Sequence, residues 1–455
     1  MILAAGEGTR MKSRRSKVLH QVAGRSLVEH VVRQALFVGA SPVVAVVGVQ
    51  GDAVRKQLVA ALPDAPLAFV EQTERLGTGD AVGRARAALD GFDGDVLILC
   101  GDVPALPGEA LAGLLEAHRA GAAALTVLSA VLDDPTGYGR VVRAARGQVH
   151  AIVEHRDCTA TQLKIREINT GTYVAHWPTL VEALGKLQPD NSQGEYYLTD
   201  AVRLLMKRGK RCLAVIHAHA DEAMGVNSRR QLAELGSVLN TRTLERLMDD
   251  GVTIIDPRAT WIDTTVSIGQ DTTVWPGVVL TGRTVIGEDC VIRPGCRLHD
   301  VTVGDGAEVL DHVIATDSHI GGGSHVGPMA HLRPGTVLIE KCKLGNFVET
   351  KKSTFGRGSK ASHLSYIGDA DVGEGVNIGA GTITCNYDGV NKYKTTLEDG
   401  VFVGSDTQLV APVTIGKGAY IGAGSTITKN VPPGALALSR TDQRNIEGWT
   451  ERRKK

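Results

Sequence analysis

The sequence predicts two parts: an α/β domain with a mostly parallel, Rossmann-like sheet, then a parallel β-helix of hexapeptide repeats. In the first half, apolar runs typical of buried strands alternate with amphipathic helical segments. In the second half, an aliphatic residue recurs at every sixth position. A chain of 455 residues is also too long for a single hydrophobic core.

The repeat is a six-residue spacing of aliphatic side chains over three long stretches. Its members are Ile268, Val274, Leu280, Ile286, Ile292 and Leu298, then Ile320, Val326, Leu332, Leu338 and Leu344, then Val403, Leu409, Ile415, Ile421 and Ile427. A period of six is neither helical nor that of a simple hairpin, and it is typical of a β-helix with one strand and one corner per repeat. Half of the 54 glycines fall between Ile262 and Asn430, where corners require positive φ and close stacking.

Two segments break this spacing. Residues 340–366 concentrate lysine and histidine, and residues 380–400 are too polar for a regular coil. A β-helix does not need interruptions to be stable, so we expect both segments to leave the coils and to carry function.

In the first half, helices are expected at 26–40 and 50–62, and strands at the start of the chain and at 41–49, 95–100 and 123–132. Ligands in such sheets bind beyond the carboxyl ends of the strands, which is where the glycine-rich loops fall.

Composition excludes several classes of protein. Lysine plus arginine equals aspartate plus glutamate at 50 each, which argues against a nucleic-acid partner. No run of about 18 apolar residues predicts a membrane span, and the first residues are apolar then basic, the reverse of a secretion signal, so we expect a cytoplasmic protein. Seven cysteines without a CxxC pair fit neither a disulfide framework nor a cysteine-based zinc site.

The first glycine loop, AAGEGTR, fits neither common phosphate-binding pattern. Met11 stands where a dinucleotide fingerprint has its third glycine, and the loop is not GxxxxGK[ST]. A strand, glycine turn and helix can still present backbone N–H groups to a phosphate, with Arg10 and Lys17 as cations. Asp102, at the end of a buried strand, is either a helix cap or a ligand for phosphate-bound magnesium.

Longer motifs in this half are LAAGEGTRM, GTG, GDVP, DPTGYGR, VEH, EINTG, QGEYYLTD and GVN. They resemble those of sugar-1-phosphate nucleotidylyltransferases. The second half adds HLRPG, GNFVETKK, SHLSYIGD, NIGAGTITCNYDG and FVGSDTQLVAPV. Together they resemble, over essentially the whole chain, the bacterial bifunctional N-acetylglucosamine-1-phosphate uridylyltransferases/glucosamine-1-phosphate N-acetyltransferases.

The resemblance implies an α/β nucleotidyltransferase domain at 1–227, a helical linker at 228–250, and a left-handed β-helix acetyltransferase domain with a C-terminal tail at 251–455. Leucines at near-helical spacing support the linker helix: Leu232, Leu235, Leu239, Leu244 and Leu247. The family's function would be acetyl transfer from acetyl-CoA to glucosamine-1-phosphate, then uridylyl transfer from UTP to N-acetylglucosamine-1-phosphate. It also implies Mg²⁺ and a homotrimer built through the β-helix.

For uridylyl transfer, the resemblance assigns Arg10 and Lys17 to countering phosphate charge and Asp102 and Asn227 to Mg²⁺. The remaining substrate-binding positions are Leu3, Ala4, Ala5, Gly6, Gln72, Gly77, Thr78, Gly101, Gly139, Glu154 and Asn169. Gln72 would read uracil, because a side-chain amide offers both a donor and an acceptor. At two positions the chain departs from the family pattern, with Ser16 in place of a proline and Cys100 in place of a tyrosine.

For acetyl transfer, the resemblance assigns His363 as the base that deprotonates the substrate amine, a role that suits histidine at neutral pH. We also expect Glu349 to orient its ring. The other assignments are Arg333, Lys351, Tyr366, Asn377, Asn386 and Tyr387 for the sugar phosphate, and Ala380, Asn386, Tyr387, Ser405, Ala423 and Arg440 for acetyl-CoA.

Two alternatives remain open from the sequence. One is a single-activity nucleotidylyltransferase whose β-helix serves only oligomerisation or regulation. The other is a non-catalytic subunit of the same architecture, which would not need Arg10, Lys17, Asp102 and Asn227.

Overall fold

A computed structural model describes residues 1–6, 8–144 and 147–453. The chain divides into two compact units, Met1–Leu239 and Asn240–Lys455. The division falls inside helix α7 (Arg229–Asp249), which covers the segment where a linker helix is predicted.

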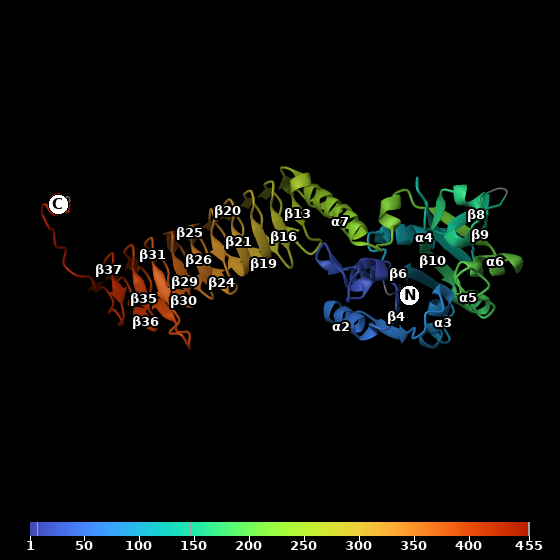
Figure 1. Ribbon diagram of the computed structural model, residues 1–455, viewed down its shortest axis with the longest axis horizontal. Coiled ribbons are helices and arrows are strands. Elements are labelled where there is room, and N and C mark those ends of the chain that lie inside the picture. Colours follow the sequence, from blue (N-terminus) through green and yellow to red (C-terminus); the bar gives the residue numbers. More distant parts are fainter. Residues whose placement is uncertain (7, 145–146, 454–455) are drawn as a thin grey trace. The chain divides into compact units, whose positions relative to one another are not determined.

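The first unit is built on one sheet with strand order β11-β7-β10-β6-β1-β4-β5, extended by the β8–β9 pair beside β10 (Figure 1). The strands are β1 (Ile2–Ala4), β4 (Val43–Val47), β5 (Leu67–Glu71), β6 (Asp95–Cys100), β7 (Leu125–Val131), β8 (Arg140–Arg143), β9 (Val149–Val153), β10 (Glu167–His176) and β11 (Cys212–Ile216). The pairs from β6 to β5 and the β11–β7 pair are parallel, whereas β10 runs antiparallel to both β6 and β7. The prediction of a mostly parallel sheet is confirmed.

Helices cover both faces of this sheet. Helices α1 (Leu27–Phe37), α2 (Gly51–Ala61) and α4 (Gly108–Ala120) share one core, and α3 (Thr78–Arg84), α5 (Trp177–Leu184) and α6 (Asp200–Lys207) share the other. Strand β4 shows why: its alternate residues enter opposite cores, Val44 and Val46 on one side and Val43 and Val47 on the other. Short elements complete the unit: η1 (Thr9–Met11), η2 (Lys17–Leu19), the hairpin β2 (Gln21–Val22) and β3 (Arg25–Ser26), and η7 (Ala220–Ala223).

The second unit is a parallel β-solenoid (Figure 1). One face is an eleven-stranded sheet of the described residues: β12 (Thr253–Ile254), β15 (Thr273–Val274), β18 (Val291–Ile292), β20 (Glu308–Val309), β22 (His325–Val326), β25 (Lys343–Asn346), β28 (Lys360–His363), β31 (Asn377–Ile378), β34 (Phe402–Val403), β37 (Tyr420–Ile421) and β39 (Leu436–Ala437).

The strands that alternate with that face form a second, bent sheet. They are β13 (Trp261–Ile262), β14 (Ser267–Ile268), β16 (Val279–Thr281), β17 (Val285–Ile286), β19 (Arg297–Val303), β21 (Ile314–Ile320), β23 (His331–Leu332), β24 (Thr336–Leu338), β26 (Glu349–Lys351), β27 (Thr354–Phe355), β29 (Tyr366–Gly368), β30 (Ala370–Val372), β32 (Ile383–Cys385), β33 (Thr395–Leu397), β35 (Gln408–Val410), β36 (Val413–Ile415) and β38 (Thr426–Ile427). The short helix α8 (Trp449–Arg452) lies in the exposed tail beyond the last coil.

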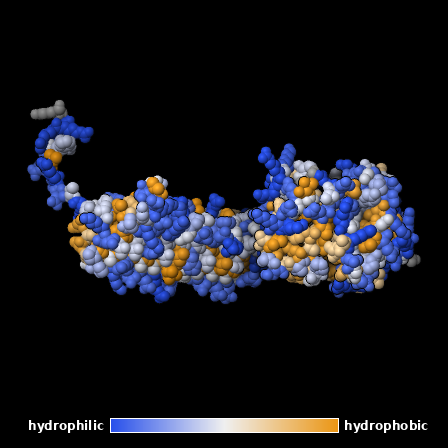
Figure 2. Space-filling model, turned by 90° about the horizontal axis from the view of Figure 1, so that it is seen from below, coloured by the Kyte–Doolittle hydropathy of each residue, from blue (hydrophilic) through white to orange (hydrophobic). Residues whose placement is uncertain are grey.

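The predicted hexapeptide ladder is confirmed, since every aliphatic residue of the three stretches is buried in one continuous core. On the side shown in Figure 2, the solenoid surface is mainly polar with scattered apolar patches. The low aromatic content agrees with this core, in which Phe355 is the only described residue with an aromatic ring.

The expected interruption at 340–366 is wrong. Strands β25 to β29 pair with their neighbours throughout, with Asn346 opposite His363 and Glu349 opposite Tyr366. These partners lie one residue closer in sequence than Val279 and Arg297 in an earlier coil. A coil shortened by one residue shifts the count of six without breaking the stack.

The expected insertion at 380–400 is shorter than predicted. Strands β32 and β33 belong to the coils, pairing with β35 and β36. Only the segment between them, residues 386–394, leaves the solenoid.

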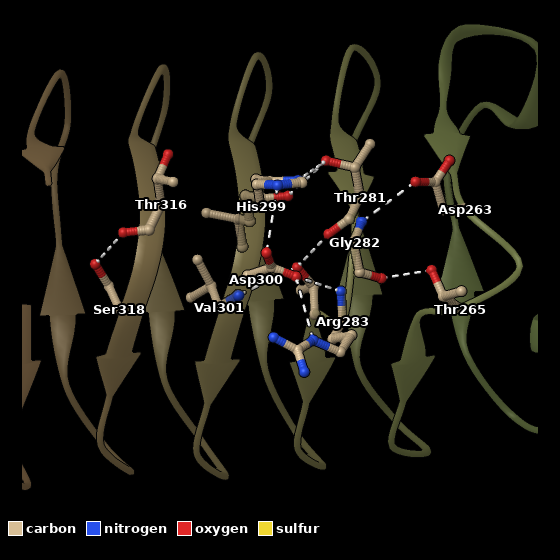
Figure 3. A network of polar contacts seen from close by, with 12 residues as sticks. Asp263, Thr265, Thr281, Gly282, Arg283, His299, Asp300, Val301, Thr316 and Ser318 are labelled. Carbon is tan, nitrogen blue, oxygen red and sulfur yellow. Dashed lines mark hydrogen bonds and ion pairs between the residues drawn. The ribbon is translucent and has the colours of Figure 1, made fainter. Parts of the chain in front are cut away.

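Acidic side chains link successive coils at a corner near the start of the solenoid (Figure 3). Asp300 accepts a hydrogen bond from the backbone N–H of Arg283 at 2.7 Å, and Asp263 accepts one from Gly282 at 3.2 Å. Gly282 has φ +69°, and a Cβ there would lie 2.4 Å from an Asp300 carboxylate oxygen, so this position requires glycine.

Replacing Asp300 by alanine should therefore destabilise the solenoid by about 1–2 kcal/mol, because a backbone donor loses its partner and alanine is strained at φ +54°. Denaturant unfolding of the whole chain measures this. Asp300→Asn keeps an acceptor and tolerates that conformation, so it should stay within about 0.5 kcal/mol of wild type. Equal stability of the alanine variant and wild type would contradict the role of this contact.

Among the described residues, no helix is long and apolar enough to cross a membrane. All seven cysteines are free.

Candidate active sites

The first unit brings Lys17, Asp102 and Asn227 together beyond the carboxyl ends of β1 and β6. Lys17 Nζ lies 2.5 Å from Asp102 Oδ2 and donates to Asn227 Oδ1 at 3.1 Å. Asn227 Nδ2 donates to the carbonyl of Gly225 at 3.3 Å, which turns Oδ1 toward Lys17. Residues 210 apart in sequence thus meet at one cation position.

The donor set at this position fits magnesium. It consists of one carboxylate and one amide oxygen, the hard ligands that Mg²⁺ accepts alongside water and substrate phosphates. No group of three histidine, cysteine, aspartate or glutamate side chains suited to a metal occurs in the described part of the chain.

A cleft beside this cluster is lined by eight residues predicted from the resemblance: Leu3, Ala5, Gly6, Lys17, Gln72, Gly77, Thr78 and Asp102. The lining is completed by Val18, Arg75, Ala81, Cys100 and Glu195. Ala4 packs into the core behind the cleft, and Gly101 donates its N–H to the carbonyl of Leu3 at 2.9 Å.

Gln72 is a buried residue that lines this cleft. Its Nε2 already donates to the carbonyl of Gly77 at 3.1 Å and to Asp80 Oδ2 at 2.9 Å. Because both contacts engage Nε2, Oε1 is the atom of this amide that is left to accept a hydrogen bond, and recognition of uracil by Gln72 stays a prediction. Gly77 has φ +106°, and a Cβ there would lie 2.6 Å from the carbonyl oxygen of Tyr196, so glycine is required.

Gly139, Glu154 and Asn169 form a second predicted group in the same unit. Asn169 donates its N–H to the Gly139 carbonyl at 2.9 Å, and a Cβ on Gly139 would lie 3.3 Å from Glu154 Oε2. Burial raises the pKa of Glu154, and a hydrogen bond from Thr199 at 3.4 Å opposes that shift.

Three further residues of interest lie around these groups. Arg10 is exposed on η1, and the described residues show no hydrogen bond or ion pair from it to the other predicted site residues. Cys100 Sγ donates to the Gly171 carbonyl at 3.4 Å, and burial with the nearby Asp102 charge raises its pKa to about 12. The thiol is therefore protonated at neutral pH. Ser16 is buried immediately before Lys17.

In the solenoid, His363 lies in one column with four of the six residues predicted to contact acetyl-CoA. On the eleven-stranded face, Lys360, Asn377, Phe402 and Tyr420 pair in register from coil to coil. Three residues further along each coil stand His363, Ala380, Ser405 and Ala423. Arg440 extends the column by donating from Nη1 to the Ala423 carbonyl at 2.6 Å.

The exposed His363 has a hydrogen-bonding partner that the sequence did not predict. Its Nδ1 lies 2.9 Å from Oδ1 of Asn346, the paired residue of the preceding coil. An Nδ1–H that donates to this oxygen leaves the lone pair on Nε2. The expected partner Glu349 is instead held by Arg333 Nη1 at 2.7 Å, so the prediction that Glu349 orients His363 is wrong. The register of shortened coils is the signal that would have identified Asn346.

Cationic groups gather on the neighbouring face. The charges of Lys392 and Arg333 lower the pKa of Lys351, so these three side chains share a small region. Lys392 belongs to the 386–394 segment and was missed by sequence reasoning, although NKYK in the polar insertion was a visible signal.

The remaining predicted residues lie on different elements. Asn386 Nδ2 donates to Asp369 Oδ2 at 2.6 Å and lies 3.5 Å from the Tyr366 hydroxyl. Tyr387 is exposed, and its hydroxyl donates to the Gly389 carbonyl. Asn377 begins β31, and no hydrogen bond joins it to the other predicted residues in the described part of the chain.

Comparisons with known proteins agree with this architecture. Residues 1–165 match the MobA-like NTP transferase domain, 260–355 match the GMPPB C-terminal domain, and 394–429 match the bacterial transferase hexapeptide. "Bifunctional protein GlmU" of Pelobacter propionicus is 50% identical over 455 residues, covering 100% of this chain and 98% of that protein. The chain belongs to the GlmU family.

Other members of the GlmU family are similar over the same length. The protein of that name from Geobacillus sp. strain WCH70 is 48% identical, covering 99% of this chain and 97% of the relative. The protein of that name from Geobacter metallireducens is 50% identical, covering 99% of this chain and 97% of the relative. These matches confirm the predicted family and a chain that combines a nucleotidyltransferase with a hexapeptide transferase.

Proposed function

We propose that this chain makes UDP-N-acetylglucosamine in two steps at two sites. The solenoid transfers an acetyl group from acetyl-CoA to glucosamine-1-phosphate, and the α/β unit then transfers uridylyl from UTP to the N-acetylated product. The observation that carries this proposal is the column from His363 to Arg440, because a β-helix that only oligomerised would not need an oriented base in line with it. Membership of a bifunctional family supports both activities.

In uridylyl transfer, an oxygen of the sugar phosphate attacks the α-phosphorus of UTP, and the bond to pyrophosphate breaks. Both reactants are anionic, so the protein must neutralise charge and align the two groups. Lys17 counters the phosphates, Gln72 Oε1 accepts N3–H of uracil, and Gly139, Glu154 and Asn169 hold the sugar. Arg10, exposed near the glycine loop, is proposed to fold over the triphosphate.

Asp102 and Asn227 would hold Mg²⁺, whose charge, when the ion is bound, offsets that of the phosphates. Lys17 Nζ contacts the same two oxygens, so the lysine also neutralises negative charge at this position.

In acetyl transfer, His363 Nε2 accepts a proton from the amine of glucosamine-1-phosphate. The amine nitrogen then forms a bond to the thioester carbonyl carbon, and the carbon–sulfur bond breaks to release coenzyme A. Arg333, Lys351 and Lys392 bind the sugar phosphate, Tyr366 and Asn377 contact the sugar, and Asn386 and Tyr387 position amine and thioester. Ala380, Ser405, Ala423 and Arg440 contact the coenzyme.

We further propose a cytoplasmic homotrimer assembled through the solenoid. The likeness to the family supports this assembly, and equilibrium sedimentation of the purified protein tests it.

One assay tests the function. The protein is given glucosamine-1-phosphate, acetyl-CoA, UTP and Mg²⁺, and each is omitted in turn. Without UTP, coenzyme A release should continue unchanged; without acetyl-CoA, no nucleotide sugar should form. Failure to release coenzyme A in the full mixture would favour the single-activity alternative, in which the solenoid is not catalytic.

Asn346 provides a more specific expectation. Asn346→Ala should lower kcat for acetyl transfer about tenfold, because His363 loses the acceptor that holds its Nδ1–H. Asn346→Asp keeps an acceptor and should retain more activity than the alanine variant. Steady-state rates of coenzyme A release measure both, and an alanine variant at the wild-type rate would contradict the proposed orientation.

A further inference from the structure

Arg140 is a buried cation without a carboxylate partner. The residue is 1% exposed, and its Nε has no hydrogen-bond partner. Nη1 donates to the carbonyl of Tyr138, and Nη2 lies 3.4 Å from Nδ1 of His155. Within the described residues, no aspartate or glutamate forms an ion pair with this guanidinium. Burying a charge against neutral acceptors is unfavourable, so folding stability alone does not explain an arginine here.

The strand register places Arg140 at the junction of the proposed sugar site. Arg140 pairs with Val153 on β9 and with Ile168 on β10. The residues that follow these partners are Glu154 and Asn169, and the residue before Arg140 is Gly139. Each of the three proposed sugar-binding residues is therefore next in sequence to Arg140 or to one of its two paired residues. Because side chains alternate along a strand, these residues face the opposite side of the sheet from the arginine.

The two contacts of the guanidinium belong to segments that carry these residues. Tyr138 closes the 134–139 loop just before Gly139, and His155 follows Glu154. The same loop lies near the proposed magnesium-binding residue Asp102, because the charge of Asp102 raises the pKa of the Tyr138 hydroxyl and the charge of Arg10 lowers it. The Arg140 side chain therefore connects the loop to the segment that follows β9, on the opposite side of the sheet from the proposed sugar-binding residues.

We propose that Arg140 is a positioning residue for N-acetylglucosamine-1-phosphate in the uridylyl-transfer site. By holding the Tyr138 carbonyl and the His155 ring, it sets the spacing of Gly139, Glu154 and Asn169 around the sugar. It does not contact the substrate. This inference rests on the proposed function and adds a residue to it.

The test compares Arg140→Met and Arg140→Lys with a matched control, Arg143→Lys, on the same strand. Arg143 differs in having a carboxylate partner, Glu167, at 2.6 Å. KM and kcat are measured for N-acetylglucosamine-1-phosphate and for UTP. We expect Arg140→Met to raise KM for the sugar phosphate at least about tenfold while KM for UTP stays within about twofold. Arg140→Lys, which keeps the charge and a donor, should recover part of the loss, and Arg143→Lys should match wild type.

An unchanged KM for the sugar phosphate in Arg140→Met would overturn the proposal. So would an equal rise in both KM values, which would indicate general damage to the unit, or the same sugar-specific rise in Arg143→Lys. If Arg140→Met does not fold, Arg140→Lys decides: a selective rise in the sugar-phosphate KM supports the proposal, and wild-type values overturn it. Turnover by the wild-type protein is a separate result, and its absence would remove the proposed function itself.

Discussion

Asp102→Ala should lower uridylyl transfer by about a hundredfold to a thousandfold and leave acetyl transfer unchanged. The reason is the convergence of Asp102 and Asn227 on Lys17: without the carboxylate, one of two oxygens at the cation position is lost, and Lys17 has no anionic partner there. Initial rates of pyrophosphate release and of coenzyme A release, taken on the same preparation, measure the two activities.

Asp102→Asn is the matched variant, because it keeps the shape and one oxygen but removes the charge. It should retain more uridylyl transfer than the alanine variant, and the deficit should shrink as Mg²⁺ is raised. A folded Asp102→Ala protein that lost both activities equally would contradict two independent sites.

His363→Ala should lower acetyl transfer by at least about a hundredfold, since general base catalysis typically contributes about 10²–10⁴ in rate. Uridylyl transfer from supplied N-acetylglucosamine-1-phosphate should be unaffected. His363→Gln fills similar space and should be equally impaired, because an amide does not accept the proton of an ammonium group.

His325 offers a control on the same face of the solenoid. It is also exposed and lies beside an acidic group, Glu308, at 3.2 Å, but it stands at the strand position of Lys343 and Lys360, outside the His363 column. His325→Ala should acetylate at the wild-type rate. Near-normal acetylation by His363→Ala would remove that residue from the role of base.

The repeats were predictable because solenoid geometry repeats along the sequence. An aliphatic residue at each sixth position, such as Ile415 or Ile421, must point inward. Glycine-rich corners indicate backbone positions with positive φ. Coil length was not predictable in the same way: a coil shortened by one residue, as between Asn346 and His363, looks like an interruption in a one-dimensional count.

Contacts between side chains were the least predictable part of the sites. Resemblance supplied His363, Gln72 and Arg333, but the partner of each depends on distances across coils or strands. Tertiary geometry places Asn346, and not Glu349, beside His363. It also brings Asp80 and the Gly77 carbonyl to the amide nitrogen of Gln72. The proximity of Lys392 to Lys351 was not predictable, because the sequence of a polar insertion does not determine which part of the solenoid its end contacts.

Mixing the two inactive variants tests the central claim most directly. Asp102→Ala and His363→Ala are each given glucosamine-1-phosphate, acetyl-CoA, UTP and Mg²⁺, separately and together in equal amounts. Neither alone should make UDP-N-acetylglucosamine, and the mixture should make it, because the acetylated intermediate passes from one protein to the other. A mixture that yields no nucleotide sugar, although each variant retains its own remaining activity, would contradict two separate sites joined by a diffusible intermediate.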